Sequence, residues 1–366
     1  MSQSLAIKII AASSRERPAD SVLRDEFRTQ RDLMPADITG ISRTVFNYFR
    51  WRGWLNPDQP LPDQIRRSRE LATLFARDPA SFSDGDMVAR VAPGWLSGEM
   101  DLSPAWARAI QAEPKLWLRA QPSQGRNLCD KLGDAELAEN AFPDALVYHG
   151  ERDLFQCDEF HAGEFEIQDI ASQAVGWLCA PKPGEKWWDT CAGEGGKTLH
   201  LSALMQNQGL IWASDRAAWR LKSLKRRAAR AKVFNFRVAA WDGSAKLPTK
   251  TKFDGILVDA PCSGIGTWQR NPHARWTTTP QDVQELAAIQ QGLLATAAPG
   301  LKPGGKLIYA VCTLTRSETI GVVNDFNARC PDFEPLVQEG LDSTRIIWPH
   351  DYGGNGMFIA GWRRKS

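Results

Sequence analysis

The strongest constraint on the fold is a regular alternation of strand-like and helix-like segments from about residue 166 onward. Short apolar runs of strand length are separated by longer segments whose apolar residues recur at helical spacing. This alternation is typical of βαβ units, which build a parallel sheet with helices on both faces. The sequence therefore predicts an α/β fold with a doubly wound, mostly parallel sheet. The expected strands are 187–189, 210–214, 234–240, 253–259, 306–311 and 357–360.

Two further regions precede this sheet. Residues 1–103 have apolar residues at helical spacing and no alternating pattern, so we expect an N-terminal helical bundle. One helix is predicted to begin near Asp37 and to end at Gly53. Residues 104–165 mix short strand-like and helix-like segments, which indicates a small α+β module. The third expected domain, Rossmann-like, covers residues 166–366.

Composition excludes several protein classes. Of 366 residues, 43% are hydrophobic and 24% are charged, as in globular rather than disordered chains. No apolar run is long enough to span a membrane, and the seven cysteines have neither disulfide-framework nor zinc-site spacing. We expect a reduced, cytoplasmic, monomeric protein that binds no membrane and no metal. Net charge is −5 over residues 104–165 but +7 over residues 166–366, which is compatible with a polyanionic partner.

Acidic residues stand at the ends of four expected strands, namely Asp189, Asp215, Asp242 and Asp259. Ligands of doubly wound sheets bind outside the carboxyl ends of the strands, so this edge is the expected ligand site. The glycine-rich loop Cys191–Thr198 follows the first strand and lets a ligand approach the backbone, although its spacing is not that of a Walker A loop. A ligand with a ribose, a cation and a carboxylate would use all these groups, and S-adenosylmethionine fits. The alternative is a tight turn without a ligand.

Two cysteines lie at the ends of neighbouring strands on the same edge. Cys262 is in a Pro-Cys turn just after strand 253–259, and Cys312 follows strand 306–311. A single cysteine is most often structural, but a pair at the ligand edge favours chemistry. A thiolate that adds to carbon 6 of a pyrimidine makes carbon 5 nucleophilic, and carbon 5 can then take an electrophilic methyl group. We interpret the other five cysteines as structural, with Cys191 in the glycine-rich loop as a partial exception.

Six motifs match one family in order and at family spacing. The chain resembles the RNA cytosine-C5 methyltransferases of the RsmB/NSUN (Sun/Fmu) type over residues 104–366, whereas residues 1–103 only loosely resemble a NusB-type domain. The resemblance implies a Rossmann-like, S-adenosylmethionine-dependent enzyme that methylates carbon 5 of a cytosine in RNA, foremost 16S ribosomal RNA, through a covalent cysteine–C6 adduct. The matching segments are Gln168–Gln173, Asp189–Thr198, Asp259–Gly264 with Gly266-Thr267, Arg270–Pro272 with Arg275-Trp276, Tyr309–Thr313 with Glu318, and Gly356–Ala360.

The resemblance also implies roles for individual residues. Cys312 would be the nucleophile, Cys262 would help to release the product, and Asp259 would contact the base. Lys197 would lie near the active site. The methyl donor would be bound by Cys191, Ala192, Gly193, Glu194, Gly195, Gly196, Lys197 and Asp259, with Asp215 at the ribose and Asp242 at the adenine. Arg270, Asn271 and Arg275 would help to order the loop after Cys262 and would contact RNA.

Two positions depart from the family pattern. Gly193-Glu194 replaces the common Ala-Pro, and Val311 replaces the usual threonine before the nucleophile. The charge of Glu194 near the donor's carboxylate is the one sequence feature that favours a non-catalytic RNA-binding assembly factor. The same residues are also compatible with a tRNA cytosine-C5 methyltransferase, with a DNA cytosine-C5 methylase that uses Cys262 as nucleophile, and with a thiol redox sensor formed by Cys262 and Cys312.

A basic run between residues 216 and 232 is the main candidate for contacts with RNA phosphates. It contains eight lysine and arginine residues, and a solvated helix face is an equally good interpretation. The target base must leave its stack to expose carbon 6, so we expect single-stranded RNA or a flipped cytosine. Trp268 and Trp276 are the expected stacking residues.

Overall fold

The computed structural model describes residues 2–30, 32–338 and 341–366, which form two compact units. The first unit comprises the chain up to Pro114 together with Gly264–Asp282, and the second comprises Lys115–Ser263 and Val283–Ser366. The division differs from the expected one in three respects. The first boundary falls at residue 114 rather than 103, and the segment Gly264–Asp282, expected in the Rossmann-like domain, belongs to the helical unit. The small module and the Rossmann-like domain lie in one unit, with no division at residue 165.

The first unit is built from helices, as the spacing of its apolar residues predicts. Helices α1, α2, α3 and the start of α4 share one apolar core, and α6 packs against α5. Helix α3 has Pro35 in its first turn, where the missing N–H of proline costs nothing. The helices are α1 (Ser2–Ala12), α2 (Ala19–Thr29), α3 (Pro35–Trp51), α4 (Leu61–Arg77), α5 (Asp84–Arg90) and α6 (Pro104–Gln111).

The second unit begins with the small α+β module. Its four-stranded antiparallel sheet has the order β2-β3-β1-β4, and its apolar core includes Leu118, Leu128, Leu146 and Phe165. The strands are β1 (Leu116–Ala120), β2 (Ala135–Leu137), β3 (Ala145–Tyr148) and β4 (Phe165–Ile167), with helices α7 (Gly125–Leu132) and α8 (Asp158–His161).

The rest of the second unit is a doubly wound sheet with the order β10-β14-β9-β8-β5-β6-β7. The run from β9 to β7 is parallel, and β14 pairs with β9 in the antiparallel sense. The first strand of the wind, β5, lies between β6 and β8, so the chain reverses direction across the sheet at β5 and β8. This reversal is the switch point at which α/β sheets bind ligands. The parallel strands are β5 (Lys186–Asp189), β6 (Leu210–Asp215), β7 (Phe236–Ala240), β8 (Phe253–Asp259) and β9 (Leu301–Val311).

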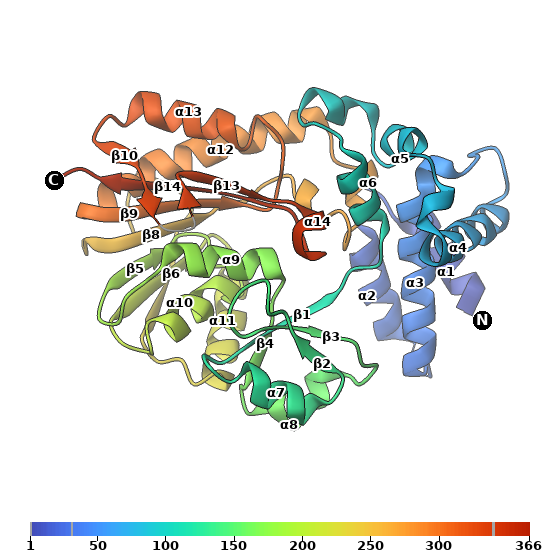
Figure 1. The fold of residues 1–366 in the computed structure, drawn as a ribbon, viewed down its shortest axis with the longest axis horizontal. Coiled ribbons are helices and arrows are strands. Elements are labelled where there is room, and N and C mark those ends of the chain that lie inside the picture. The colour runs from blue at the N-terminus through green and yellow to red at the C-terminus, as the bar shows by residue number, and fades with distance from the viewer. Residues whose placement is uncertain (1, 31, 339–340) are drawn as a thin grey trace. The chain divides into compact units, whose positions relative to one another are not determined.

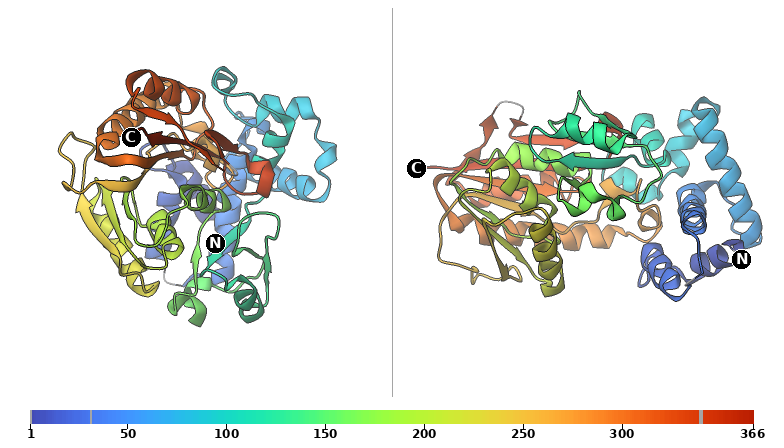
Figure 2. Two further views of the ribbon diagram at one scale, coloured as in Figure 1. Left: turned by 60° about the vertical axis from the view of Figure 1, so that its left-hand side comes forward. Right: turned by 90° about the horizontal axis from the view of Figure 1, so that it is seen from below.

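Helices cover both faces of this sheet (Figures 1 and 2). Apolar residues of α12 (Pro280–Ala297) and α13 (Ile320–Arg329) pack on one face, and those of α9 (Ile170–Cys179) and α10 (Gly196–Leu204) pack on the other. Helix α11 (Ala218–Arg230) packs with α10 beside β6. The two-sided burial explains the continuous apolar runs of the central strands.

A close approach of two strands at the switch point requires a glycine. Gly255 of β8 pairs with Trp187 of β5, and a Cβ at Gly255 would come within 2.3 Å of the Trp187 ring. The glycine therefore allows a large indole to fill the centre of the sheet next to the ligand edge.

The chain ends in strands that the sequence pattern revealed only in part. β14 (Met357–Arg364) extends four residues beyond the expected strand, and β10 (Phe333–Pro335) and β13 (Thr344–Ile347), which were not expected, both pair with it. Strands β11 (Val337–Gln338) and β12 (Leu341–Asp342) pair with each other, and α14 (Pro349–Tyr352) precedes β14.

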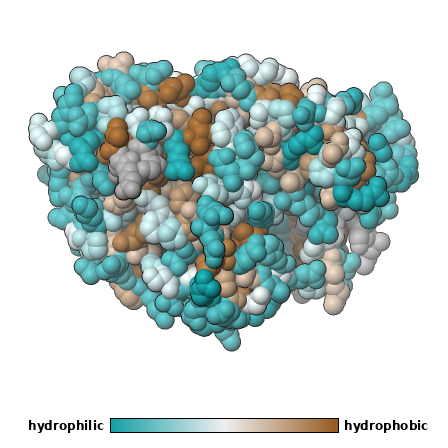
Figure 3. Space-filling model, viewed as in Figure 1, coloured by the Kyte–Doolittle hydropathy of each residue, from teal (hydrophilic) through white to brown (hydrophobic). Residues whose placement is uncertain are grey.

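Hydrophobic side chains on the face shown in Figure 3 lie in small groups among hydrophilic ones. Among the described residues, no helix has the length and apolar character needed to cross a membrane. The described residues also contain no group of three or more His, Cys, Asp or Glu side chains arranged to hold a metal ion.

Candidate active site

The four predicted acids lie at the carboxyl edge of the sheet, three as the last residues of their strands. Asp189, Asp215 and Asp259 end β5, β6 and β8, and Asp242 comes two residues after β7. A cavity of about 420 Å³ opens beside them, a size that suits a small-molecule cofactor. Its wall combines the glycine-rich loop and carboxylates with apolar side chains. The lining includes Cys191, Ala192, Gly193, Glu194, Asp215, Asp242, Asp259, Pro261, Ile289 and Leu293.

The glycine-rich loop is shaped for a ligand by its backbone. Gly195 has a φ of 91°, and a Cβ there would come within 2.6 Å of the Leu224 side chain. Asp215 holds the loop, because its Oδ2 accepts a hydrogen bond from the Gly193 N–H at 3.0 Å. Helix α10 then begins at Gly196, so its N-terminus adjoins the cavity wall and favours an anionic group. This wall fits S-adenosylmethionine. Its carboxylates suit the ribose, the helix N-terminus suits the carboxylate of the ligand, and the apolar residues suit the adenine base.

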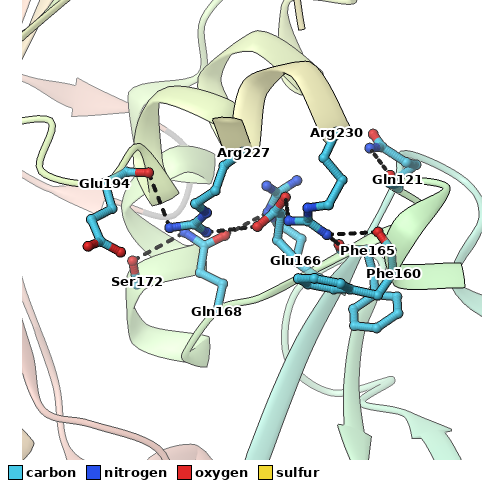
Figure 4. A network of polar contacts seen from close by, with 11 residues as sticks. Gln121, Phe160, Phe165, Glu166, Gln168, Ser172, Glu194, Arg227 and Arg230 are labelled. Carbon is cyan, nitrogen blue, oxygen red and sulfur yellow. Dashed lines mark hydrogen bonds and ion pairs between the residues drawn. The ribbon is translucent and has the colours of Figure 1, made fainter. Parts of the chain in front are cut away.

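Glu194 lines the donor cavity but is exposed, so its charge is not buried there. Its backbone oxygen accepts a hydrogen bond of 3.2 Å from Arg227 of α11, and Arg227 also pairs with Glu166 of the small module at 2.7 Å (Figure 4). The loop that lacks the family's proline is therefore tied to α11 through Arg227.

Asp189 is fully buried at the end of β5. Its Oδ2 accepts a hydrogen bond of 2.6 Å from Thr198, while its Oδ1 has no hydrogen-bond partner among the described residues. Burial raises the pKa of the Asp189 carboxyl to about 7, and the Thr198 hydrogen bond only partly offsets this.

This raised pKa predicts that the free energy of unfolding falls as the pH rises from about 4 to about 7. The unfolded carboxyl titrates near its ordinary value of 3.8, so between about pH 4 and 7 the folded state holds a proton that the unfolded state has released. The Asp189 contribution is full below the unfolded pKa and disappears as pH rises through about 7. The loss between pH 5 and 7 is at most about 2.7 kcal/mol. Urea unfolding from pH 5 to 8 should show a steeper decline for the wild type than for Asp189→Asn, and parallel curves would contradict the assignment.

Lys197 and Asp259 form an ion pair between the loop and β8. The Lys197 Nζ lies 2.7 Å from the Asp259 Oδ2, and the lysine side chain is 11% exposed. Burial lowers the pKa of Lys197, but the charge and hydrogen bond of Asp259 outweigh burial and the net pKa is raised. Lys197 is therefore a permanent cation that holds the Asp259 carboxylate at the cavity wall.

The two predicted cysteines meet beside this ion pair. Cys262 follows β8 and Cys312 follows β9, which are adjacent parallel strands, and the two sulfurs are 3.3 Å apart. The hydrogen bond from Cys262 lowers the pKa of the Cys312 thiol and outweighs the opposing effect of burial. A lowered pKa increases the thiolate fraction near neutral pH, and the thiolate is the nucleophilic form.

Glu318 organises both cysteine loops, a role that the sequence pattern did not reveal. Its carboxylate is fully buried and accepts hydrogen bonds from the Ser263 N–H at 2.8 Å, Thr315 Oγ1 at 2.9 Å, Gln290 Nε2 at 3.0 Å and Thr313 Oγ1 at 3.1 Å. Ser263 Oγ donates to it as well. Ser263 adjoins Cys262 and Thr313 adjoins Cys312, so one carboxylate holds both thiols. The hydroxyl-rich segment Thr313–Glu318 is the sequence signal that could have pointed to this role.

Replacing Glu318 with glutamine should impair catalysis more than folding. The glutamine side chain would place its NH2 group, a donor, where the Glu318 carboxylate oxygen accepted hydrogen bonds. At least one of these hydrogen bonds is therefore lost, and we expect the two cysteine loops to shift. We expect methyl transfer to fall about 100-fold, the order of effect that a displacement of about 1 Å can produce. The loss of stability should be about 2 kcal/mol. Turnover and urea unfolding should be compared with the exposed control Glu334→Gln, and unchanged turnover in Glu318→Gln would show that Glu318 does not position the thiols.

The structure corrects the predicted role of Arg275 in RNA binding. Its side chain is fully buried in the helical unit, so it cannot reach RNA, although it does order the segment that follows Cys262. Trp268, a predicted stacking residue, is also fully buried, whereas Trp276 is half-buried and donates a hydrogen bond to the Phe49 carbonyl. Arg270 and Asn271 are half-buried. The Arg275 guanidinium donates hydrogen bonds to the carbonyls of Arg50, Val91, Ile110 and Trp268 and to the Gln111 side chain.

The basic run divides into two groups. Arg227 and Arg230 turn toward the small module and bind Glu166, whereas Arg216, Arg220, Lys222, Lys225, Arg226 and Lys232 are exposed. Only this second group retains the predicted possibility of contacts with RNA phosphates.

Fold and site together define an S-adenosylmethionine-dependent methyltransferase of the Rossmann-like class. The family model described as 16S rRNA methyltransferase RsmB/F matches residues 176–363. The chain is 32% identical over 354 residues to a probable ribosomal RNA small subunit methyltransferase B of Synechocystis, with 91% of this chain and 77% of that protein covered. The chain thus belongs to the RsmB/F family of RNA methyltransferases.

Other similar proteins agree with this placement. A probable ribosomal RNA small subunit methyltransferase B of Bacillus subtilis is 36% identical over 220 residues, which cover 57% of this chain and 49% of that protein. The crystal structure of PH0851 superposes with a TM-score of 0.79 at 22% identity, covering 100% of this chain and 99% of that one. NSun6 from Pyrococcus horikoshii, solved with SFG, has a TM-score of 0.64 at 20% identity and covers 72% and 94% of the two chains. These structures show a shared fold.

Proposed function

We propose that the protein methylates carbon 5 of a cytosine in RNA through a covalent adduct with Cys312. The observation that carries the proposal is the pair of thiols 3.3 Å apart beside the donor cavity. A single activated thiol would suffice for addition to a base, and a second thiol at this distance supplies a group for the later removal of a proton. S-adenosylmethionine supplies an electrophilic methyl group.

Each residue of the site has a step that suits its chemistry. The Cys312 thiolate adds to carbon 6, and the electron pair released into the ring makes carbon 5 nucleophilic. Asp259, held by Lys197, contacts the base and assists its activation. After carbon 5 has been methylated, Cys262 assists removal of the carbon 5 proton. The electron pair of that C–H bond then re-forms the double bond and expels the Cys312 thiolate.

The donor is held by the remaining predicted residues. The loop Cys191–Lys197 receives its amino-acid end, Asp215 its ribose and Asp242 its adenine, with Pro261, Ile289 and Leu293 as apolar wall. Hydrogen bonds from Ser244 lower the pKa of the Asp242 carboxyl, so it is ionised at neutral pH and can accept hydrogen bonds. On the RNA side, Arg270 and Asn271 would contact a single-stranded or flipped target.

We infer that the substrate is small-subunit ribosomal RNA, because the similar proteins from Synechocystis and Bacillus subtilis carry that name. The test is transfer of a labelled methyl group to purified 16S rRNA, tRNA and DNA, followed by digestion to nucleosides. Label in 5-methylcytidine from 16S rRNA is the expected result. Label in tRNA alone would show that tRNA rather than 16S rRNA is the substrate. Label in another nucleoside would overturn the cytosine-C5 assignment. RNA binding without label would favour the non-catalytic assembly factor.

A further inference from the structure

A second cavity lies on the second unit, lined by the small module together with α10 and the residues after α11. Its volume is about 460 Å³, and it is separate from the donor cavity, with which it shares no lining residue. Two cations and two carboxylates line it: Arg119, Lys232, Glu164 and Glu166.

The two carboxylates of this cavity are already paired. Glu166 is 2% exposed, and its two oxygens bind Arg227 and Arg230, which approach from α11 (Figure 4). Glu164 pairs with Lys131 at 2.7 Å. Glu166 also lies opposite Arg119 in the β1–β4 pairing, and its charge partly offsets the effect of burial on the pKa of Arg119, so three arginines share this one carboxylate.

Within the described chain, neither cation of the cavity has a carboxylate to itself. Arg119 is 4% exposed, and its Nε donates a hydrogen bond of 2.6 Å to Gln168, whereas its two η nitrogens bind no residue that the structure describes. Lys232 is exposed at the cavity and likewise forms no ion pair within the described chain. Burial lowers the pKa of Arg119 to about 10, so the guanidinium still carries its charge at neutral pH.

A buried cation that shares Glu166 with two other arginines is unfavourable, because its desolvation is only partly repaid. The free η nitrogens of an arginine present a planar pair of donors that matches two oxygens of a phosphate. Neutral polar side chains of Ser202, Gln206 and Asn207 complete the polar part of the wall. In and beside this pocket, lysine and arginine side chains therefore outnumber the two carboxylates.

We propose that this cavity binds a phosphate group, gripped by Arg119 with support from Lys232. The phosphate comes from the backbone of the RNA or from a free phosphate ester. The RNA source rests on the proposed function, in which the protein acts on RNA. A phosphate bound here would anchor the RNA on the small module at a point distinct from the cysteines, and would position the strand without reading its sequence.

The test uses the full chain with Arg119→Met, Lys232→Met and the control Arg126→Met. Arg126 lies on the same module, but its side chain is 80% exposed and lies 3.9 Å from Glu139. Filter binding of 16S rRNA across a range of KCl concentrations gives the affinity and its salt dependence. Arg119→Met should weaken binding by about tenfold and flatten the slope of log K against log salt by about 0.7, the value for one phosphate of a single strand. Lys232→Met should act in the same direction, and Arg126→Met should change affinity less than about twofold.

A second measurement distinguishes the source of the phosphate. Inorganic phosphate, compared with chloride at matched ionic strength, should raise the melting temperature of the wild type more than that of Arg119→Met. Phosphate stabilisation with unchanged RNA binding would assign the pocket to a free phosphate ester. Unchanged values in both measurements, or equal effects of Arg126→Met, would overturn the proposal.

Three outcomes separate a folding defect, a failure of this inference and a failure of the proposed function. If Arg119→Met does not fold, Lys232→Met decides, because its exposed side chain can be replaced without disturbing the core. If 5-methylcytidine forms normally while RNA affinity, salt slope and stabilisation by phosphate are all unaffected by both substitutions, this inference fails and the proposed function stands. If RNA binding responds as expected but no 5-methylcytidine forms in the wild type, the proposed chemistry fails and the phosphate site stands.

Discussion

Cys312→Ala is expected to abolish methyl transfer, with a fall in rate of about 10⁴-fold or more. Without the Cys312 thiolate, no nucleophile adds to carbon 6 of the cytosine. Carbon 5 of the unmodified ring is then too weak a nucleophile to take the methyl group. The measurement is incorporation of labelled methyl into 16S rRNA, with 5-methylcytidine recovered after digestion. The variant should still bind S-adenosylmethionine, because Cys312 does not line the donor cavity.

The matched control is Cys129→Ala on α7 of the small module. Cys129 is a half-buried cysteine in a separate apolar core, so its removal should leave the rate unchanged. Transfer by Cys312→Ala at the wild-type rate would exclude Cys312 as nucleophile.

Cys262→Ala is expected to stop turnover while a covalent protein–RNA adduct accumulates. The Cys312 thiolate remains able to attack, but the group that assists loss of the carbon 5 proton is missing, so the adduct is not resolved. The measurement is a protein band of reduced mobility on a denaturing gel, which disappears after digestion with ribonuclease. The double variant Cys262→Ala with Cys312→Ala should form no such band.

The same substitution carries a pH signature. The hydrogen bond from Cys262 lowers the pKa of Cys312, so its loss should raise that pKa and shift adduct formation toward higher pH. The rate of adduct formation by Cys262→Ala should therefore increase with pH over a range where the wild-type thiol is already ionised. An adduct formed by Cys312→Ala but not by Cys262→Ala would reverse the two roles, as in a DNA-type cytosine methylase.

The parts of the site that sequence reasoning placed correctly lie at strand ends. Asp189, Asp215 and Asp259 end their strands as expected, because apolar runs of strand length define where a parallel strand stops. The approach of Cys262 to Cys312 followed from the adjacency of two consecutive strands, and their sulfurs are indeed in contact. The α/β class and the family also agree with the expectation.

The parts that sequence reasoning missed depend on burial over long separations in the chain. An arginine and a tryptophan in a loop are residue types that often bind RNA, but Arg275 and Trp268 are both buried in the helical unit. There, Arg275 donates hydrogen bonds to backbone carbonyls that lie 165 to 225 residues away in the chain. The expected boundary at residue 103 failed for the same reason, since α6 packs with the preceding helix rather than with the small module.

The sequence by itself determined the alternation of elements, the strand-end acids and the identity of the two thiols, because these follow from local apolar periodicity and from the chemistry of single side chains. Only the tertiary structure decided which polar groups are satisfied. Three residues look alike as charged residues in the sequence: Glu318 between the cysteine loops, Asp189 with one oxygen unpartnered among the described residues, and Arg119, which shares Glu166 with two other arginines. They differ because desolvation depends on the neighbours that folding brings from distant segments, and that cost sets which charge is structural, which titrates and which awaits a ligand.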